Sequence, residues 1–350
     1  MNNSNKNTSN DFPIFIVGLS RSGTTLLRKI MNKHSDVWIA ERETHYFDDL
    51  RVRMTGFEQQ PLNPEQIKLC QDYFLALGHR VYGNGGDPEQ SWINRTELET
   101  LAESLGTGAD SYFEAFCRFC AQSNNKIRWG EKTPRHVFRI SEILTRYPQA
   151  KIICMLRHPG GVVASSRDKW KREQMPDHQR TRLKNSYSIV ITILLWRGAF
   201  KAALKAHQEF GEERIYIQRF EDLLADPESA IKALTAWLAL DYQSSMIEAP
   251  SSNSSYSELY GKSGFSKETT YRWQEKLSNA EISTIQYLCG SLLSEAGYEQ
   301  QLIRHSLFLI TWLWITLPFS LLRALLANNH RIANIPQYIW QRFRLAVLQR

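Results

Sequence analysis

The chain has 350 residues, of which 42% are hydrophobic and 23% are charged, with 18 Gly and 12 Pro. This usage is typical of globular proteins and excludes a collagen-like, coiled-coil or fully disordered chain. The formal net charge of +7 would suit a nucleic acid, an anionic membrane or a phosphorylated substrate. Residues 301–350 contain six Arg and no Lys, Asp or Glu, so only +1 remains for the rest of the chain. Because the positive charge belongs largely to this C-terminal segment, a nucleic acid is the least favoured partner.

The N-terminal residues and the cysteines indicate a cytoplasmic protein. Residues 1–10 are polar, lack the apolar stretch of a secretory signal, and are expected to be a disordered lead-in. A mean hydropathy of −0.41 argues against a multi-span membrane protein. The five Cys form an odd, scattered set, which is typical of reduced thiols. Cys117 and Cys120 form a lone CxxC in an apolar-periodic helical segment, without the second ligand pair of a zinc site, so no metal is expected.

A strand, a loop and a helix open the folded region. Residues 14–17 form a short apolar strand, and a Gly/Ser turn follows it. Beyond the turn, Leu26, Leu27, Ile30 and Met31 recur at helical spacing. A unit of this kind is expected in an α/β sheet whose crossovers return the strands in parallel.

Further candidate strands lie at residues 37–43, 151–156 and 214–220. Residues 51–130 are predicted to be helical insertions around a Gly-rich loop. The pattern up to residue 300 predicts one P-loop-type, doubly wound α/β domain with a parallel sheet flanked by helices. In such a domain the ligand crevice lies at the C-terminal ends of the strands.

The turn after the first strand, GLSRSGTT at residues 18–25, is a candidate phosphate loop. Backbone amides and a helix N-terminus converge on an anion at this place in the fold. Gly18 and Gly23 have the GxxxxG spacing of a Walker A loop, but the next residue is Thr24, where an NTPase carries Lys. A magnesium-dependent kinase or NTPase is therefore an alternative, as is a tight turn that binds nothing.

Three further segments carry chemically active side chains. They are ERETHYFDD at residues 41–49, WGEKTPRH at residues 129–136 and RHPGGVVASS at residues 157–166. Together with RSGTT at residues 21–25, this combination in this order closely resembles the sulfotransferases that use 3′-phosphoadenosine 5′-phosphosulfate (PAPS). The resemblance covers roughly residues 12–300 and implies a sulfotransferase domain over residues 11–300.

Within that superfamily, the chain is most similar to the Golgi-type carbohydrate and tyrosylprotein branches. ETHYFD at residues 43–48 is similar to the EIHFFD element of heparan sulfate 3-O-sulfotransferases, whose leading Glu is the catalytic base. EKTP at residues 131–134 resembles their EKTP element, whose Lys lines the reaction centre. RSGTTLLR looks more like the tyrosylprotein enzymes. Leu26 stands where the cytosolic branch carries a Trp that stacks on adenine, which leaves adenine recognition open.

The resemblance also implies which residues bind the donor. The 5′-phosphosulfate would be bound by five consecutive residues, Arg21, Ser22, Gly23, Thr24 and Thr25. Arg157 and Ser165 would hold the 3′-phosphate, a doubly charged group that suits the planar donor fork of Arg. Additional candidates for the 3′-phosphate come from a loosely matched loop and its neighbour, namely Lys262, Lys267 and Arg272.

The implied reaction is in-line transfer of a sulfuryl group to an acceptor hydroxyl or amine. Arg21 and Lys132 would neutralise charge on the leaving phosphate, and Glu43 would remove the acceptor proton as general base. His45 is the next candidate for the base, and His136 is a further one. A divalent metal is not required, because Arg, Lys and loop amides can meet the charges of the donor.

The C-terminal segment, residues 301–350, is expected to be a hydrophobic, basic, membrane-associating tail. Residues 306–322 carry no charge and lie between Arg304 and Arg323, but a span needs about 20 apolar residues and Pro318 would kink the helix. Aromatic residues near the C-terminus suit a headgroup interface on the cytosolic face. The alternatives are a C-terminal helix buried against the domain and a dimer contact.

The acceptor is left open between a glycan, a glycolipid, a lipid-like small molecule and a protein tyrosine. Residues 51–110 and 171–188 are expected to shape its pocket, and the tail mildly favours a lipid-linked or amphipathic acceptor. A homo-oligomer is compatible with the sequence. The alternative of another class is a catalytically silent nucleotide-binding membrane protein, which Glu43, Lys132, Arg157 and Ser165 together speak against.

Overall fold

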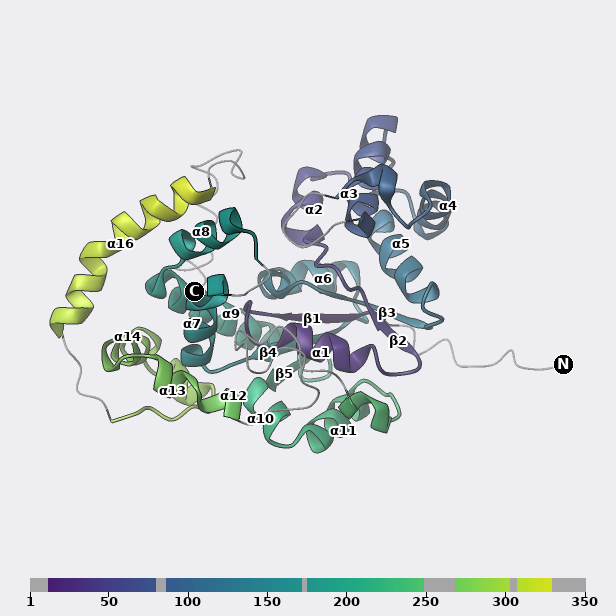
Figure 1. Ribbon diagram of the computed structural model, residues 1–350. Coiled ribbons are helices and arrows are strands. Elements are labelled where there is room, and N and C mark those ends of the chain that lie inside the picture. The colour runs from purple at the N-terminus through teal and green to yellow at the C-terminus, as the bar shows by residue number, and fades with distance from the viewer. Residues whose placement is uncertain (1–11, 80–85, 172–174, 249–267, 303–306, 329–350) are drawn as a thin grey trace.

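The computed structural model describes residues 12–79, 86–171, 175–248, 268–302 and 307–328. Its centre is a five-stranded parallel sheet in the order β2-β3-β1-β4-β5. The strands are β1 (Ile14–Gly18), β2 (Val37–Ile39), β3 (Arg128–Lys132), β4 (Lys151–Leu156) and β5 (Ile215–Arg219). Helices cover both faces of the sheet, which confirms the predicted doubly wound α/β fold (Figure 1).

The two faces of the sheet are buried in separate cores because side chains alternate along each strand. Phe15 and Val17 of β1 face one core, whereas Ile14 and Ile16 face the other. The first core is covered by α3 (Pro64–His79), α4 (Arg95–Leu105), α5 (Ala109–Gln122), α6 (Ile140–Arg146) and part of α9 (Ile189–Phe210). The second is covered by α1 (Thr24–Met31), α10 (Phe220–Ala225) and α11 (Pro227–Trp237). The central strands are therefore apolar on both sides, as their continuous apolar runs indicate.

A third apolar cluster lies beside the sheet and joins the later helices to α9. It involves α7 (Pro159–Arg167), α13 (Trp273–Lys276), α14 (Asn279–Cys289) and α15 (Leu292–Glu295). The remaining α-helices are α2 (Leu50–Arg53), α8 (Asp177–Ser186), α12 (Glu268–Tyr271) and α16 (Leu307–Asn328). Short 3-10 helices are η2 (Tyr46–Asp48), η3 (Pro88–Gln90), η4 (Pro134–Arg139), η5 (Lys169–Lys171) and η6 (Ser244–Glu248).

The sheet differs from the sequence prediction at β3, because its first three residues, 128–130, fall in the region 51–130 that was predicted to be helical. All five residues of β3 are buried, although Arg128, Glu131 and Lys132 are charged. Its burial depends on ion pairs and on Trp129 and not on an apolar run, so hydrophobic pattern does not reveal it. The second predicted strand, residues 37–43, is longer than the observed β2, which ends at Ile39.

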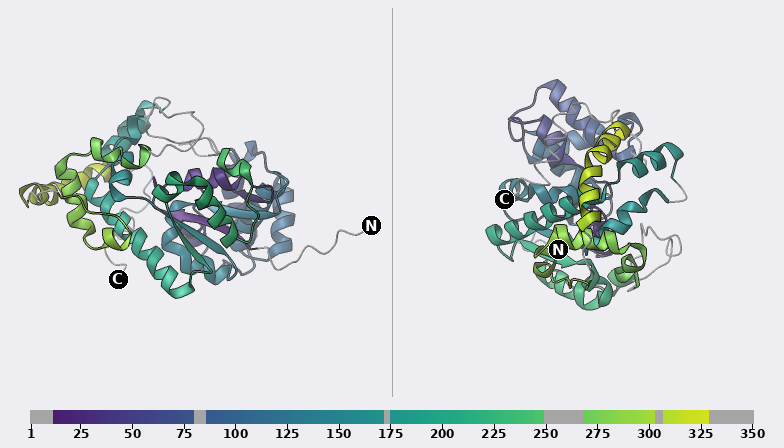
Figure 2. Two further views of the ribbon diagram at one scale, coloured as in Figure 1. Left: turned by 90° about the horizontal axis from the view of Figure 1, so that it is seen from below. Right: turned by 90° about the vertical axis from the view of Figure 1, so that its left-hand side faces the viewer.

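The described part of the C-terminal segment lies on the outside of the molecule. Helix α16, yellow in Figures 1 and 2, lies apart from the sheet and contacts α8 and α14. Within the described ranges no helix alone has the length and apolarity of a membrane span, and one pair, α8 and α9, meets that test together across a 76° bend. The predicted lead-in at residues 1–10 and the last part of the predicted tail, residues 329–350, lie outside the described residues.

The five cysteines, predicted to be reduced thiols, form no disulfide in the structure. Cys117 and Cys120 lie on α5, and all five Cys are free and buried. Burial raises the pKa of the Cys120 thiol to about 12, so it is protonated at neutral pH. The CxxC pair is part of the core that covers the sheet.

Candidate active site

The loop between β1 and α1 is packed too tightly for side chains at its two glycines. Gly18 has a φ of +143°, and a Cβ added there would lie 2.4 Å from the carbonyl oxygen of Met155 on β4. Gly23 has a φ of +92°, and a Cβ there would lie 2.4 Å from the ring of Phe220. The amide of Ser22 donates to the carbonyl of Leu19 across the turn at 3.1 Å. The glycines thus let the loop close over the sheet and leave its amides at the N-terminus of α1.

Arg21 links this loop to α7. It is a non-glycine residue with a φ of +77°, a strained conformation of the kind found at functional sites. Its Nε donates to the Ser165 hydroxyl at 2.8 Å, and its carbonyl oxygen accepts from Arg157 at 3.0 Å. Three residues predicted to bind the donor are therefore in direct contact with one another.

Arg157, which follows β4, is buried and held from several directions. Its guanidinium lies 4.5 Å from the ring centroid of Phe220, and its carbonyl oxygen accepts from Trp196 Nε1 at 2.8 Å. It also donates to the carbonyl of Thr269 on α12 at 3.5 Å. The ring of Phe220 and the carbonyl oxygens of Arg21 and Thr269 orient the guanidinium.

The contact with Thr269 brings the neighbourhood of Arg272 to the same strand end. Arg272 lies between α12 and α13 and forms a 3.6 Å ion pair with Glu268. The other two weaker candidates for the 3′-phosphate, Lys262 and Lys267, lie outside the described residues.

On the other side of β1, Lys132 is the last residue of β3 and pairs with Glu43. Its side chain is 4% exposed, and its Nζ lies 2.6 Å from Glu43 Oε1. The Glu43 side chain is 38% exposed, and its second oxygen lies 3.5 Å from His45 Nε2. Burial alone would raise the pKa of Glu43, but the hydrogen bond from His45 and the charge of Lys132 outweigh it and lower the pKa to about 2. Glu43 is therefore ionised and within reach of a substrate.

From His45 the contacts continue inward as a run of alternating charges, here called the charge chain. His45 Nδ1 lies 3.3 Å from Asp48 Oδ1, and the same oxygen lies 3.5 Å from His136 Nε2. His136 Nδ1 then lies 3.1 Å from Glu131 Oε2. The charge chain comprises, in order, Lys132, Glu43, His45, Asp48, His136 and Glu131. Three cations and three carboxylates thus alternate between the half-exposed Glu43 and the fully buried Glu131, with Lys132 on the other side of Glu43.

The charge chain keeps both histidines protonated. Burial alone would lower the pKa of His45, but the Asp48 and Glu43 carboxylates outweigh it and raise the pKa to about 9. Burial alone would also lower the pKa of His136, but the carboxylates of Glu131 and Asp48 outweigh it and raise the pKa. Burial alone would raise the pKa of Asp48, but the hydrogen bonds from His136 and His45 outweigh it and hold the pKa well below its usual range. A protonated His45 is a hydrogen-bond donor, so of the predicted bases Glu43 is the one in the basic form.

Glu131 anchors the segment that carries Glu43 and His45. It is fully buried and accepts from the amide and the hydroxyl of Thr44, at 3.3 and 3.0 Å, and from the Thr133 hydroxyl. Tyr73 on α3 donates to the carbonyl of Thr44 at 2.7 Å. Glu131 therefore fixes the loop that follows β2 onto the end of β3, and burial keeps it out of contact with substrate.

The order of the strands places the loop between these two groups. β1 pairs with β3 on one side and with β4 on the other, so that Ile16 is in register with both Lys132 and Ile153. Lys132 ends β3, and Arg157 follows the end of β4. The phosphate loop is therefore flanked by the Glu43–Lys132 pair on one side and by Arg157 and Ser165 on the other.

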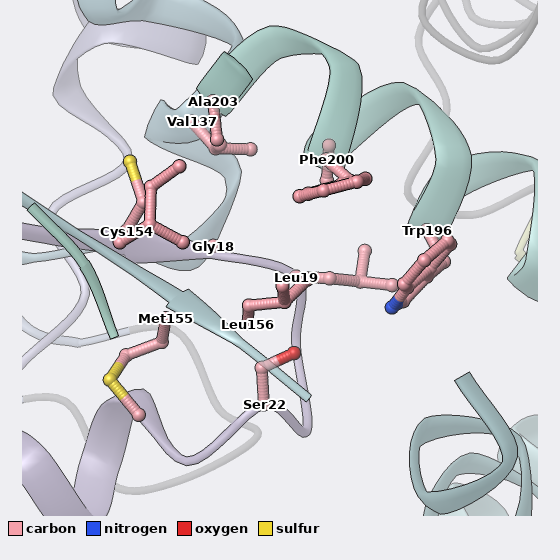
Figure 3. A pocket seen from close by; sticks show the side chains of 12 residues that line it. Gly18, Leu19, Ser22, Val137, Cys154, Met155, Leu156, Trp196, Phe200 and Ala203 are labelled. Atoms are coloured by element: carbon pink, nitrogen blue, oxygen red, sulfur yellow. The ribbon is translucent and has the colours of Figure 1, made fainter. Parts of the chain in front are cut away.

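A small apolar cavity lies beneath the loop, between the sheet and α9 (Figure 3). Figure 3 shows Ser22 and Leu19 of the loop facing Leu156 of β4, with Trp196 and Phe200 coming from α9. Its volume of about 10 Å³ is no more than one water molecule needs, so it is a packing gap and not a ligand site. Across the described part of the chain, no group of three or more His, Cys, Asp or Glu is arranged to hold a metal ion.

Two residues that position the site were not found by sequence reasoning. Trp196 lies in the apolar middle of α9, where its indole nitrogen gives no signal in the hydrophobic pattern. Thr269 acts through its backbone carbonyl, which any residue could supply. Phe220 is the last residue of the strand predicted at 214–220 and directly follows β5 in the structure, and this place at the C-terminal edge of the sheet was the available signal.

A parallel sheet with a glycine-containing strand–loop–helix turn at its C-terminal edge, flanked by cations and by the Glu43 carboxylate, is consistent with a P-loop-type nucleotide-binding fold. The family model described as "Sulfotransferase family" matches residues 13–244. The chain belongs to this sulfotransferase family.

Two curated relatives show how far the similarity extends. The chain is 24% identical over 304 residues to nodulation protein NoeE of Sinorhizobium fredii, a match that covers 82% of this chain and 66% of that protein. It is 26% identical over 263 residues to omega-hydroxy-beta-dihydromenaquinone-9 sulfotransferase Stf3 of Mycobacterium bovis, covering 66% of this chain and 63% of that protein. The chain thus spans about two thirds of the length of these relatives. The resemblance to the Golgi-type branches stays a prediction.

Two solved structures share the fold. The sulfotransferase domain from the curacin biosynthetic pathway has a TM-score of 0.50 at 18% identity, covering 83% of this chain and 99% of that domain. The sulfotransferase domain from the Synechococcus PCC 7002 olefin synthase has a TM-score of 0.51 at 17% identity, covering 85% and 99%. Both confirm the predicted fold class.

Proposed function

We propose that this protein is a PAPS-dependent sulfotransferase that transfers a sulfuryl group to the hydroxyl of a lipid-like acceptor. The observation that carries the proposal is the position of the phosphate loop between the Glu43–Lys132 pair and the contacts among Arg21, Arg157 and Ser165. Such a loop binds the 5′-phosphosulfate, the arginine side holds the 3′-phosphate, and the carboxylate side receives the acceptor.

The residues of the loop fit the donor by charge and by hydrogen-bonding capacity. The amides from Ser22 to Thr25 lie at the N-terminus of α1, where the helix dipole favours an anion. The hydroxyls of Thr24 and Thr25 and the guanidinium of Arg21 add donors to the sulfuryl and phosphate oxygens. Arg157 and Ser165 would then meet the 3′-phosphate, with Ser165 exchanging its bond from Arg21 for one to the ligand.

In the proposed step, the acceptor oxygen attacks sulfur in line with the bridging oxygen of the 5′-phosphate. A new oxygen–sulfur bond forms, and the bond from sulfur to the bridging oxygen breaks. The acceptor proton passes to the Glu43 carboxylate, and adenosine 3′,5′-bisphosphate leaves with its new charge met by Arg21 and Lys132.

The pairing of Glu43 with Lys132 suggests how the base is activated. While Lys132 contacts Glu43, the pKa of Glu43 is about 2, which makes the carboxylate a weak base. When Lys132 turns to the leaving phosphate, Glu43 loses this partner and becomes more basic, while His45 still holds its second oxygen. The donor therefore strengthens the base that the transfer requires.

A lipid-like acceptor is the class that the relatives support. Stf3 is named as a sulfotransferase of omega-hydroxy-beta-dihydromenaquinone-9, and this chain is 26% identical to it. We also propose a cytoplasmic location, which the five buried, free cysteines support.

The test is mass spectrometry of purified full-length protein incubated with PAPS and candidate acceptors. The acceptors are an isoprenoid alcohol, a glycan and a tyrosine peptide. We expect a product heavier by one SO₃ group from the isoprenoid alcohol, without added Mg²⁺. Transfer of phosphate from ATP with Mg²⁺, and none from PAPS to any acceptor, would identify a kinase instead.

A further inference from the structure

Helix α16 exposes an apolar stripe along one side. Trp312, Ile315, Phe319, Leu322 and Leu326 are spaced by three and four residues, which places them on one helix face. Each of these side chains is 56–72% exposed. Single exposed apolar residues are ordinary on a protein surface, but five that form a continuous stripe mark an interaction site.

The helix is held against the domain. It contacts α8 and α14, and Leu317 packs against the third apolar cluster. An open groove of about 470 Å³ separates α8 from α16, lined by Asn185, Phe319, Leu322, Arg323 and Leu326. Figures 1 and 2 show α16 on the outside of the molecule, beside α8. The apolar stripe therefore has a fixed place on the surface.

The surroundings of the apolar stripe are cationic. Arg323 on α16 and Lys184 on α8 are exposed, as is Lys171 at the end of η5, whose Nζ also lies 3.0 Å from Asp168 Oδ1. The ammonium groups of Lys184 and Lys171 lie 5.2 and 5.7 Å from the ring centroid of Trp170. In the sequence, residues 301–350 contain six Arg and no acidic residue.

This combination favours a bilayer over a second copy of the chain. Pairing two α16 helices in parallel about a twofold axis would bring their Arg323 guanidinium groups together, with no carboxylate on the helix to offset them. An anionic bilayer satisfies both features, because acyl chains receive the apolar face and lipid phosphates receive the cations. Trp312 and Trp314, both exposed, are of the type enriched at the headgroup level.

We propose that α16 and the adjoining basic α8 form a membrane-binding face that seats in the headgroup region of an anionic bilayer. This face extends the proposed function but does not depend on it, since it rests on surface side chains that contact neither Glu43 nor Arg157. It would hold the domain beside a pool of amphipathic molecules.

The experiment is co-sedimentation of the full chain with vesicles of phosphatidylcholine, with or without phosphatidylglycerol. We expect binding to the anionic vesicles, and a loss of at least about tenfold in affinity in the triple variant Ile315→Ser, Phe319→Ser, Leu326→Ser. The control Ile127→Ser, at a residue 70% exposed on β3's N-terminal side, should bind as the wild type does. Arg323→Glu should weaken binding to anionic vesicles by about tenfold and leave the weak binding to neutral vesicles unchanged.

Far-ultraviolet circular dichroism and binding of adenosine 3′,5′-bisphosphate establish that each variant is folded. If the triple variant does not fold, Phe319→Ser and Arg323→Glu carry the test separately. Equal vesicle binding by the wild type and these variants would overturn the proposal. The proposal would also be overturned if light scattering showed the wild type to be a dimer and the triple variant a monomer, and the wild type did not bind vesicles.

Discussion

The two sides of the phosphate loop hold their charges in different ways. On the side of β3, the cations and carboxylates of the charge chain alternate from the half-exposed Glu43 to the fully buried Glu131. On the side of β4, Arg21 and Arg157 are held by a hydroxyl, by carbonyl oxygens and by an aromatic ring. The first side is a set of paired charges that can shift protons, and the second presents cations to an anion.

This difference predicts different failures when each side is changed. Removing one member of the charge chain leaves another charge without its partner, so both stability and proton transfer suffer. Removing a cation on the β4 side weakens ligand binding and leaves the fold largely intact. The following variants separate these outcomes, beginning with the largest expected effect.

Glu43→Gln should reduce kcat by about 100- to 10,000-fold, because the amide cannot accept the acceptor proton. Binding of adenosine 3′,5′-bisphosphate, measured by calorimetry, should be retained. Glu41→Gln is the matched control, since Glu41 lies on the same segment with a side chain that is 62% exposed and pairs with Arg28. Turnover by Glu43→Gln close to the wild-type rate would refute the assignment of the base.

His136→Gln should lower the free energy of unfolding by about 3 kcal/mol, because Glu131 and Asp48 then remain buried without their shared cation. Urea denaturation at neutral pH measures this loss. The exposed His178 on α8 provides the control His178→Gln, for which we expect a change of less than about 0.5 kcal/mol. A stability equal to the wild type would mean that the charge chain does not hold the two segments together.

Arg157→Ala should weaken binding of adenosine 3′,5′-bisphosphate by about 10- to 100-fold, the usual cost of a lost charge-assisted hydrogen bond. Arg157→Lys should bind adenosine 3′,5′-bisphosphate with an affinity between those of Arg157→Ala and the wild type, since Lys keeps the charge but lacks the planar fork of Arg. Arg214→Ala is the control, because Arg214 precedes β5 and lies at the opposite end of the strands. Unchanged affinity in Arg157→Ala would place the 3′-phosphate elsewhere.

The same comparison explains what the sequence could reveal. β1 and β4 are apolar runs, and the loop between β1 and α1 is marked by its glycines, so the fold class and the position of this loop in the fold were predictable. β3 was not, because its buried Glu131 and Lys132 are stable only beside His136, Thr44 and Glu43. The hydrophobic pattern around one strand cannot show partners that lie after another strand. The sequence did, however, single out the two segments that supply these partners, residues 41–49 and 129–136.

The smallest expected effect tests the charge chain through pH. The pKa of His45 is about 9 in the folded protein and near 6.5 when unfolded, so its stabilising charge is fully present below pH 6.5. That contribution is lost as the pH rises through 9. Because the His45 side chain is 35% exposed, solvent screening reduces the loss to about 1 kcal/mol.

Urea denaturation at pH 6.5 and at pH 9.5 should therefore show the wild type losing about 1 kcal/mol more than His45→Gln across this interval. The carboxylates of Glu43 and Asp48 have depressed pKa values and stay ionised throughout, so they contribute no change of their own. His136, whose pKa is also raised, is present in both proteins and keeps its contacts with Asp48 and Glu131. Parallel pH profiles for the two proteins would show that His45 is neutral in the folded state, and Glu43 would then have Lys132 as its cationic partner.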